Sequence, residues 1–141
     1  MKNYYLILVL LIAHSGFSQS LPIHFEGDVK TKDFVNFDGG SGIVTANPNP
    51  SGINTSDSVA RIIRNEGAVW AGSKILLTKN LDFSVLTKIS MKVYTSAPSG
   101  TKVKFKLEGS GSSVDVDAIT TVSGAWETLE WTFVGIPNTL N

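Results

Sequence analysis

The chain has 141 residues, no cysteine, and 12 basic against 12 acidic side chains. Such a balanced charge argues against a nucleic-acid partner, because binding to phosphates requires a clustered surplus of basic side chains. Without cysteine the protein has neither a disulfide nor a lipid-attachment cysteine.

Residues 1–18 have the pattern of a secretory signal peptide. Lys2 provides a basic start, residues 4–13 are almost wholly apolar, and Gly16 and Ser18 are small residues of the kind that precede a cleavage site. The apolar run is too short to span a bilayer as a helix. We therefore expect a protein that is secreted or held at the cell surface, with no membrane partner, whose residues 19–141 form one domain.

The rest of the chain reads as short extended segments separated by turns. Asp38-Gly39 predicts a tight turn, and the two prolines at positions 48 and 50 predict a long surface loop over residues 47–56. We expect strands at 21–26, 43–46, 59–64, 69–77, 88–94, 102–108, 114–121 and 125–133. This spacing predicts an all-β protein, an antiparallel β-sandwich of jelly-roll type. A further strand would begin at Thr139, so the sequence leaves open whether the last strand is missing.

The clearest pattern is the strict alternation in residues 88–94 and 102–108, on either side of a turn at residues 97–100. We expect these two strands to pair as an antiparallel hairpin. One face would then enter the core, with Ile89, Met91, Val93, Val103, Phe105 and Leu107. The opposite face would carry Tyr94 and several lysines together, which describes either a solvated surface or a platform for a polar ligand.

Several short segments, in their order along the chain, carry a resemblance to a known family. They are Leu-Pro-Ile-His-Phe-Glu at 21–26, Asn-Pro at 47–48, Gly-Ile-Asn-Thr-Ser at 52–56, Trp-Ala-Gly-Ser-Lys at 70–74, Val-Lys-Phe-Lys-Leu-Glu at 103–108 and Gly-Ala-Trp-Glu-Thr-Leu at 124–129. Together they resemble the galactose-binding-like carbohydrate-binding modules attached to secreted bacterial polysaccharide-degrading enzymes. The resemblance implies a jelly-roll sandwich, a non-catalytic role beside a glycoside hydrolase, and a structural calcium ion held partly by Glu26.

Sugar binding requires a stacking aromatic ring with hydrogen-bonding groups beside it. Trp70 and Tyr94 are the candidate rings, and the polar candidates are Lys104, Lys106, Glu108 and Glu130. The competing interpretation makes the lysine stripe a solubilising face whose stems cover apolar surface. We expect Trp126 to contact the core, whereas Gly72 opens space beside Trp70 and leaves its exposure undecided.

Calcium requires six to eight oxygen ligands, usually carboxylates and loop carbonyls. Glu26 and Asp28 flank one turn, and the loop at Asn47 offers carbonyl oxygens, so these three residues are the candidate metal site. Asp115 and Asp117 share one face of a strand and could also hold an ion, although such a pair is more often a solvated edge.

Catalytic chemistry has few candidates in residues 19–141. His24 is the only histidine there, and no nucleophile, zinc or phosphate-loop motif occurs. A glycosidase would need two carboxylates across a cleft, for which Glu108 and Glu130 are the only pair worth naming. We therefore predict a non-enzymatic polysaccharide-binding module that keeps an associated hydrolase or its cell near a glycan. The alternative is a structural or adhesive β-sandwich spacer without a sugar site.

Overall fold

The computed structural model describes residues 21–84 and 87–136. The predicted signal peptide and the predicted start of a strand at Thr139 lie outside these residues. Within them, no helix is long and apolar enough to cross a membrane.

The described part of the chain consists of eight strands and one turn of 3-10 helix. In chain order these are η1 (Thr31–Asp33), β1 (Phe34–Phe37), β2 (Gly40–Ala46), β3 (Ser58–Arg64), β4 (Gly72–Ile75), β5 (Lys88–Tyr94), β6 (Lys102–Gly109), β7 (Ser112–Ile119) and β8 (Trp126–Thr132). The strands form four antiparallel pairs, β1 with β4, β2 with β3, β5 with β8 and β6 with β7. An all-β fold with antiparallel sheets agrees with the predicted β-sandwich.

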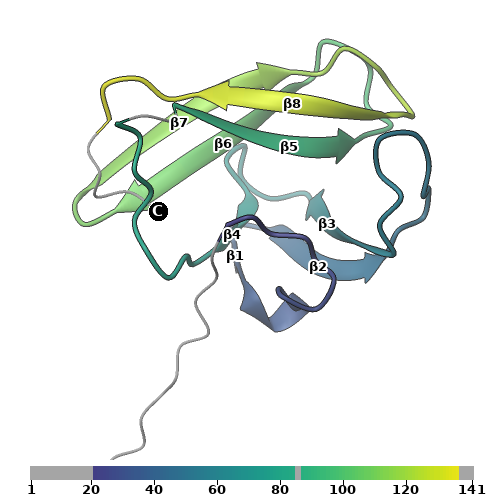
Figure 1. Ribbon diagram of the computed structural model, residues 1–141, viewed down its shortest axis with the longest axis horizontal. Helices are drawn as coiled ribbons and strands as arrows, with labels where there is room; N and C mark the ends of the chain where they lie inside the picture. The colour runs from purple at the N-terminus through teal and green to yellow at the C-terminus, as the bar shows by residue number, and fades with distance from the viewer. Residues whose placement is uncertain (1–20, 85–86, 137–141) are drawn as a thin grey trace, which may run out of the picture.

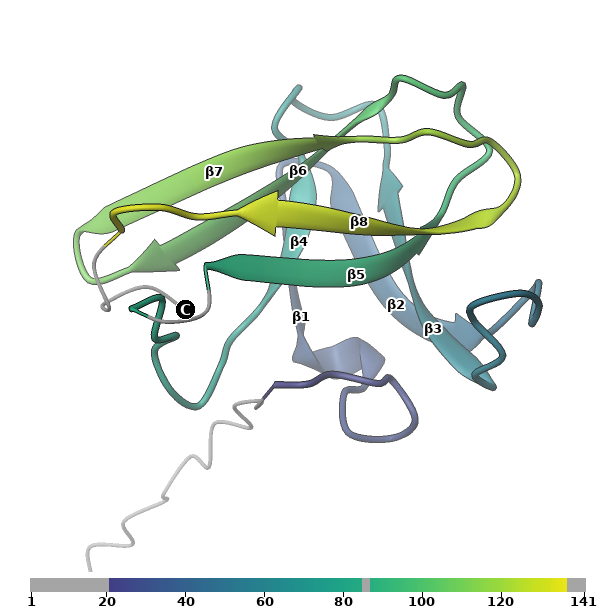
Figure 2. The ribbon, with the colours of Figure 1, turned by 45° about the horizontal axis from the view of Figure 1, so that its top comes forward.

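The four pairs are grouped in two parts, which Figure 1 shows one above the other. The part that contains β5–β8 and β6–β7 has the larger apolar core. Phe105 of β6 packs on Trp131 of β8 with 5.3 Å between ring centroids, and the Trp131 indole donates a hydrogen bond of 2.9 Å to the carbonyl of Val103. The buried residues of this core are Phe83, Leu107, Ala118, Leu129, Trp131 and Phe133. Because these contacts join the inner faces of two strand pairs, the pairs are stacked as two layers (Figure 2).

The part that contains β1–β4 and β2–β3 is organised by the turn between β1 and β2. Asp38 and Gly39 have φ values of 52° and 98°, so the predicted Asp-Gly turn has both central residues in the left-handed region, as in a type I′ turn. The start of β2 then passes so close to the start of β4 that a Cβ at Gly40 would overlap the backbone of Gly72. The two backbones therefore approach each other closely at Gly72.

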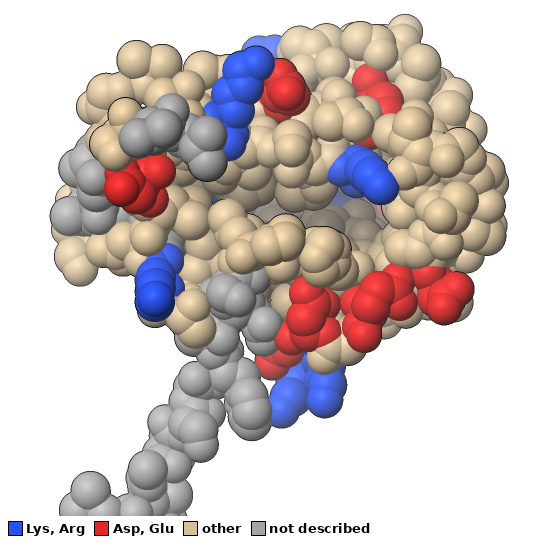
Figure 3. Space-filling model, viewed as in Figure 1, with Lys and Arg blue, Asp and Glu red and all other residues tan. Residues whose placement is uncertain are grey.

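An ion pair and a hydrogen bond join the two parts. Lys74 of β4 forms a 2.7 Å ion pair with Glu108 at the end of β6. The indole of Trp126, at the start of β8, donates a 2.8 Å hydrogen bond to the carbonyl of Asn49, in the loop between β2 and β3. Figure 3 shows that the face between the two parts is hollowed at its centre, with acidic side chains gathered along its lower edge.

The predicted hairpin between residues 88–94 and 102–108 is wrong. Both segments are strands, but β5 pairs with β8 and β6 pairs with β7. The turn segment pairs across to the end of β7 instead, since Thr120 exchanges backbone hydrogen bonds with Gly100 and Thr101. Alternation determines which face of a strand is apolar, and it says nothing about the neighbouring strand. Stacking the two segments face to face covers both apolar faces, which side-by-side pairing alone would leave exposed.

Three smaller expectations also differ from the structure. Residues 21–26 form no strand, and Phe25 has a φ of 61°, which is incompatible with an extended segment. The strand expected at 69–77 is limited to β4, because the residues before it form a turn in which the amide of Ala68 donates to the carbonyl of Asp38 in the β1–β2 turn. Met91 is 42 % exposed although it lies on the inner face of β5, opposite the buried Leu129.

Candidate functional site

The predicted sugar-binding residues are divided between two strand pairs. Tyr94 and Glu130 lie on the outer face of β5–β8, whereas Lys104, Lys106 and Glu108 lie on β6, on the side opposite its buried Phe105 and Leu107. The inner faces of the two pairs pack against each other, so these residues do not form one platform. This correction follows directly from the wrong hairpin.

On β6–β7 the lysines and acids form a ladder of ion pairs. Lys104 contacts both Asp115 and Asp117, and the second contact is 3.1 Å long. Lys102 also reaches Asp117, at 3.3 Å. Lys104 donates hydrogen bonds to Asp115 and to Asp117, which raise the pKa of Lys104, Asp115 having the larger effect. The bond from Lys104 lowers the pKa of Asp117. The ladder thus agrees with a solvated face whose charges compensate one another.

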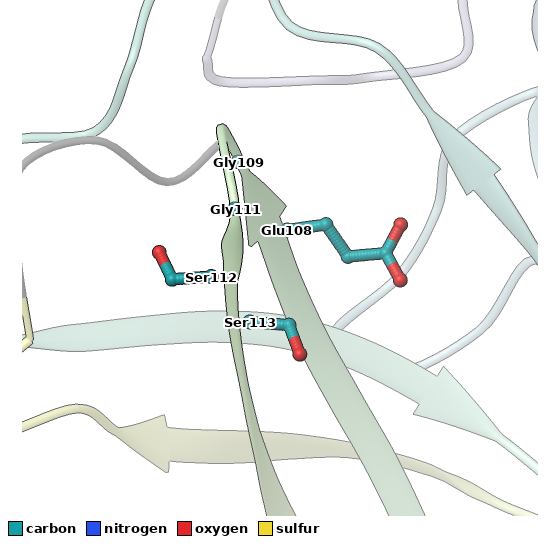
Figure 4. A pocket seen from close by; sticks show the side chains of 5 residues that line it. All are labelled: Glu108, Gly109, Gly111, Ser112 and Ser113. Atoms are coloured by element: carbon teal, nitrogen blue, oxygen red, sulfur yellow. The ribbon is translucent and has the colours of Figure 1, made fainter.

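Glu108 lies at the end of this ladder and is held from two sides. Lys106 approaches its Oε1 to 2.8 Å and Lys74 approaches its Oε2 to 2.7 Å. These contacts, Lys106 first, lower the pKa of Glu108 to about 2. A separate hollow of about 340 Å³ lies beside Glu108. Glu108, Gly109, Gly111, Ser112 and Ser113 line it (Figure 4). None of the described residues that line this hollow is aromatic, so they offer no stacking surface for a sugar.

Trp70 lies in the turn between β3 and β4 and is strongly exposed. The residue is 68 % accessible, and its indole N–H donates a 2.8 Å hydrogen bond to Oδ2 of Asp38 in the β1–β2 turn. The two turns are further tied together, because the amide of Ala68 donates to the carbonyl of Asp38 at 3.0 Å. The indole therefore has a defined orientation while most of its surface faces solvent.

A second aromatic group lies where β5 ends and β8 begins. Tyr94 and Trp126 are cross-strand partners, with ring centroids 5.6 Å apart and ring planes inclined by 58°. Tyr94 is 38 % exposed, and Trp126 is half-buried against the loop that contains Asn49. Trp126 shares the outer face with Thr128 and is outside the buried cluster, so its expected contact with the core is not what the structure shows.

Glu130 lies farther along this outer face. Its Oε2 accepts a 2.8 Å contact from Lys88. Since both side chains are about half exposed, the pair is an ordinary surface ion pair. Glu130 is thus separated from the aromatic end of the strand pair.

The predicted calcium ligands are engaged in local hydrogen bonds. Oε1 of Glu26 accepts from the amide of Ser58, at 3.0 Å. Asp28 accepts from the amides of His24 and Val29, and these bonds lower its pKa although burial acts against them. The side chain of Asn47 closes its own loop through Asn49 and Ser56. Among the described residues no three acidic, histidine or cysteine side chains gather as a metal site.

The positions of two residues beside the exposed aromatic rings were not foreseen from the sequence. Asp38 was recognised only as a turn former, because its partner Trp70 is 32 positions away. Trp126 could have been placed correctly, since the same alternation that buries Leu129 and Trp131 puts Trp126 on the opposite face.

Comparison of the chain with models of known families, with curated proteins and with solved structures gave no match.

Proposed function

We propose that this protein is a secreted, non-catalytic polysaccharide-binding module with jelly-roll connectivity, which holds an associated glycoside hydrolase or its cell near a glycan. The observation that carries the proposal is the exposed, oriented indole of Trp70. A pyranose ring stacks on an aromatic face through its apolar side, and fixing the indole in advance reduces the entropy lost on binding.

The same observation argues against the spacer alternative. Burial of such a side chain in a structural sandwich would contribute about 2 kcal/mol or more, whereas an oriented, exposed ring serves a ligand. Here Trp131 is 1 % exposed and serves the core, whereas Trp70 remains outside it. Asp38, which could equally face solvent, is used to orient the indole.

A hydrolase based on Glu108 and Glu130 has less support. The two carboxylates belong to different strand pairs, and each is paired with lysine. A general acid for glycoside cleavage needs a raised pKa, whereas the lysines lower that of Glu108 to about 2. The geometry thus favours binding without catalysis.

The test is affinity electrophoresis of residues 19–141 in gels that contain a panel of neutral polysaccharides, β-glucans and galactans included. We expect one polymer to slow the wild-type protein, and Trp70→Ala to lose at least tenfold in affinity for it without a change in the unfolding midpoint. Trp70→Phe keeps a stacking ring and should retain most of the binding. Equal retardation of wild type and Trp70→Ala on every polymer that binds would contradict the assignment to Trp70.

A further inference from the structure

The ends of β5 and β8 form an aromatic corner, defined by Tyr94 and Trp126, that no part of the Trp70 site uses. The two rings are in contact, with their centroids 5.6 Å apart and their planes inclined by 58°. The indole N–H of Trp126 is fixed by the carbonyl of Asn49 at 2.8 Å, which prevents this ring from turning. The partly exposed Tyr94 is therefore supported from one side by an immobile ring.

The loops beside the aromatic corner are also tied together. The amide of Gly124 donates to the carbonyl of Thr95 at 2.8 Å, and the hydroxyl of Ser123 donates to the carbonyl of Ser96 at 3.2 Å. Gly124 lies next to the tyrosine, since a Cβ at this position would be 4.0 Å from the Tyr94 hydroxyl. The paired loops hold the surroundings of the Tyr94 ring in place before any ligand arrives.

Lys92 lies on the same outer face, two residues before Tyr94, about 7 Å along the strand. It differs from the neighbouring strand lysines in its electrostatic environment. Lys88, Lys102, Lys104 and Lys106 all have an acidic partner. Lys92 has no salt bridge to any residue in the ranges 21–84 and 87–136, and its cross-strand partner is Thr128. An uncompensated ammonium group beside stacking rings is suited to a ring with a negative substituent.

We propose that the aromatic corner and Lys92 form a second glycan-binding site, selective for a sugar that carries a carboxylate or sulfate group. The proposal rests on the proposed function for its ligand class. The segment 65–71, which contains Trp70, and the ends of β5 and β8 lie apart in both ribbon views (Figures 1 and 2). One long chain that occupied both sites would be bound with higher avidity than either site provides.

The test uses residues 19–141 in gels that contain alginate, sulfated carrageenan or neutral agarose. Tyr94→Leu keeps apolar contact with Trp126 while removing the aromatic face. Lys92→Gln removes the charge. We expect at least one anionic polymer to retard the wild type, and each variant to lose at least fivefold in affinity for that polymer. Alginate retention indicates a carboxylate ligand, and carrageenan retention indicates a sulfate ligand.

Two controls separate this proposal from the first one. Tyr94→Phe should bind as wild type does, because it keeps the ring and the fold. Lys102→Gln removes a lysine that already has an acidic partner, so it should also bind as wild type does. If Tyr94→Leu and Lys92→Gln bind anionic polymers as wild type does, or if no anionic polymer retards the wild type, the second site is refuted. Either result leaves the Trp70 site standing, since that site is tested on neutral polymers with a different variant.

Discussion

Replacing Trp131 with phenylalanine tests the stacking of β5–β8 on β6–β7. Trp131 is 1 % exposed, its indole donates to the carbonyl of Val103, and its ring packs on Phe105. The substitution removes one hydrogen bond, worth about 1 kcal/mol. It also leaves a void where the larger ring was, which costs about 1–2 kcal/mol more.

We therefore expect Trp131→Phe to lower the free energy of unfolding by about 2–3 kcal/mol, measured by urea denaturation with circular dichroism. For a domain of this size the melting temperature should fall by roughly 8–12 °C. Trp70→Phe is the matched control and should change stability by less than about 0.5 kcal/mol, because its indole lies at the surface. A loss below about 0.5 kcal/mol for Trp131→Phe would show that the two layers are not packed through this residue.

Three further predictions concern the ion pairs, the metal and the orientation of the indole. Glu108→Gln should lower the free energy of unfolding at pH 7 by less than about 1 kcal/mol. Since Lys106 and Lys74 lower the pKa of Glu108 from 4.5 to about 2, the difference between wild type and variant should disappear as the pH falls from about 4.5 to 2. A difference that persists at pH 2 in urea titrations would show that the effect comes from packing. If calcium is bound, chelation should lower the melting temperature by several degrees, and an unchanged scan would remove calcium from the account. Asp38→Gly keeps the positive φ but frees the Trp70 indole, so it should weaken retention in affinity gels severalfold. Asp38→Asn keeps an acceptor and should bind as wild type does. Binding equal to wild type by both variants would show that the orientation of the indole is unimportant.

The faces of the strands could be predicted from the sequence. The alternation around Leu129, Trp131 and Phe133 places these three residues on one face, and all three are buried in the core. The choice of strand partners could not be predicted. Residues 95–101 connect β5 and β6 with a length that suits a hairpin as well as a crossover between layers, and the choice depends on apolar surface supplied by β8, far along the chain.

The candidate site shows the same limit. Trp70 and Tyr94 were named as candidates because sugar binding needs an aromatic ring, but their neighbours come from distant segments. Asp38 orients Trp70, and Asn49 fixes Trp126 across 77 positions. Long-range hydrogen bonds of this kind leave no periodic signal. The lysine stripe was recognisable, but only the register of β6 with β7 shows that acids on β7 compensate it.

The most direct test of the central claim is the dissociation constant of wild type and Trp70→Ala for the neutral polysaccharide that retards the wild type most. It is measured by affinity electrophoresis over a range of polymer concentrations, with the unfolding midpoint of each protein determined in parallel. The account predicts at least a tenfold weaker constant for Trp70→Ala and equal midpoints. Retention by no neutral polymer, from a wild-type sample with a cooperative unfolding transition, would contradict polysaccharide binding through Trp70 and favour the spacer.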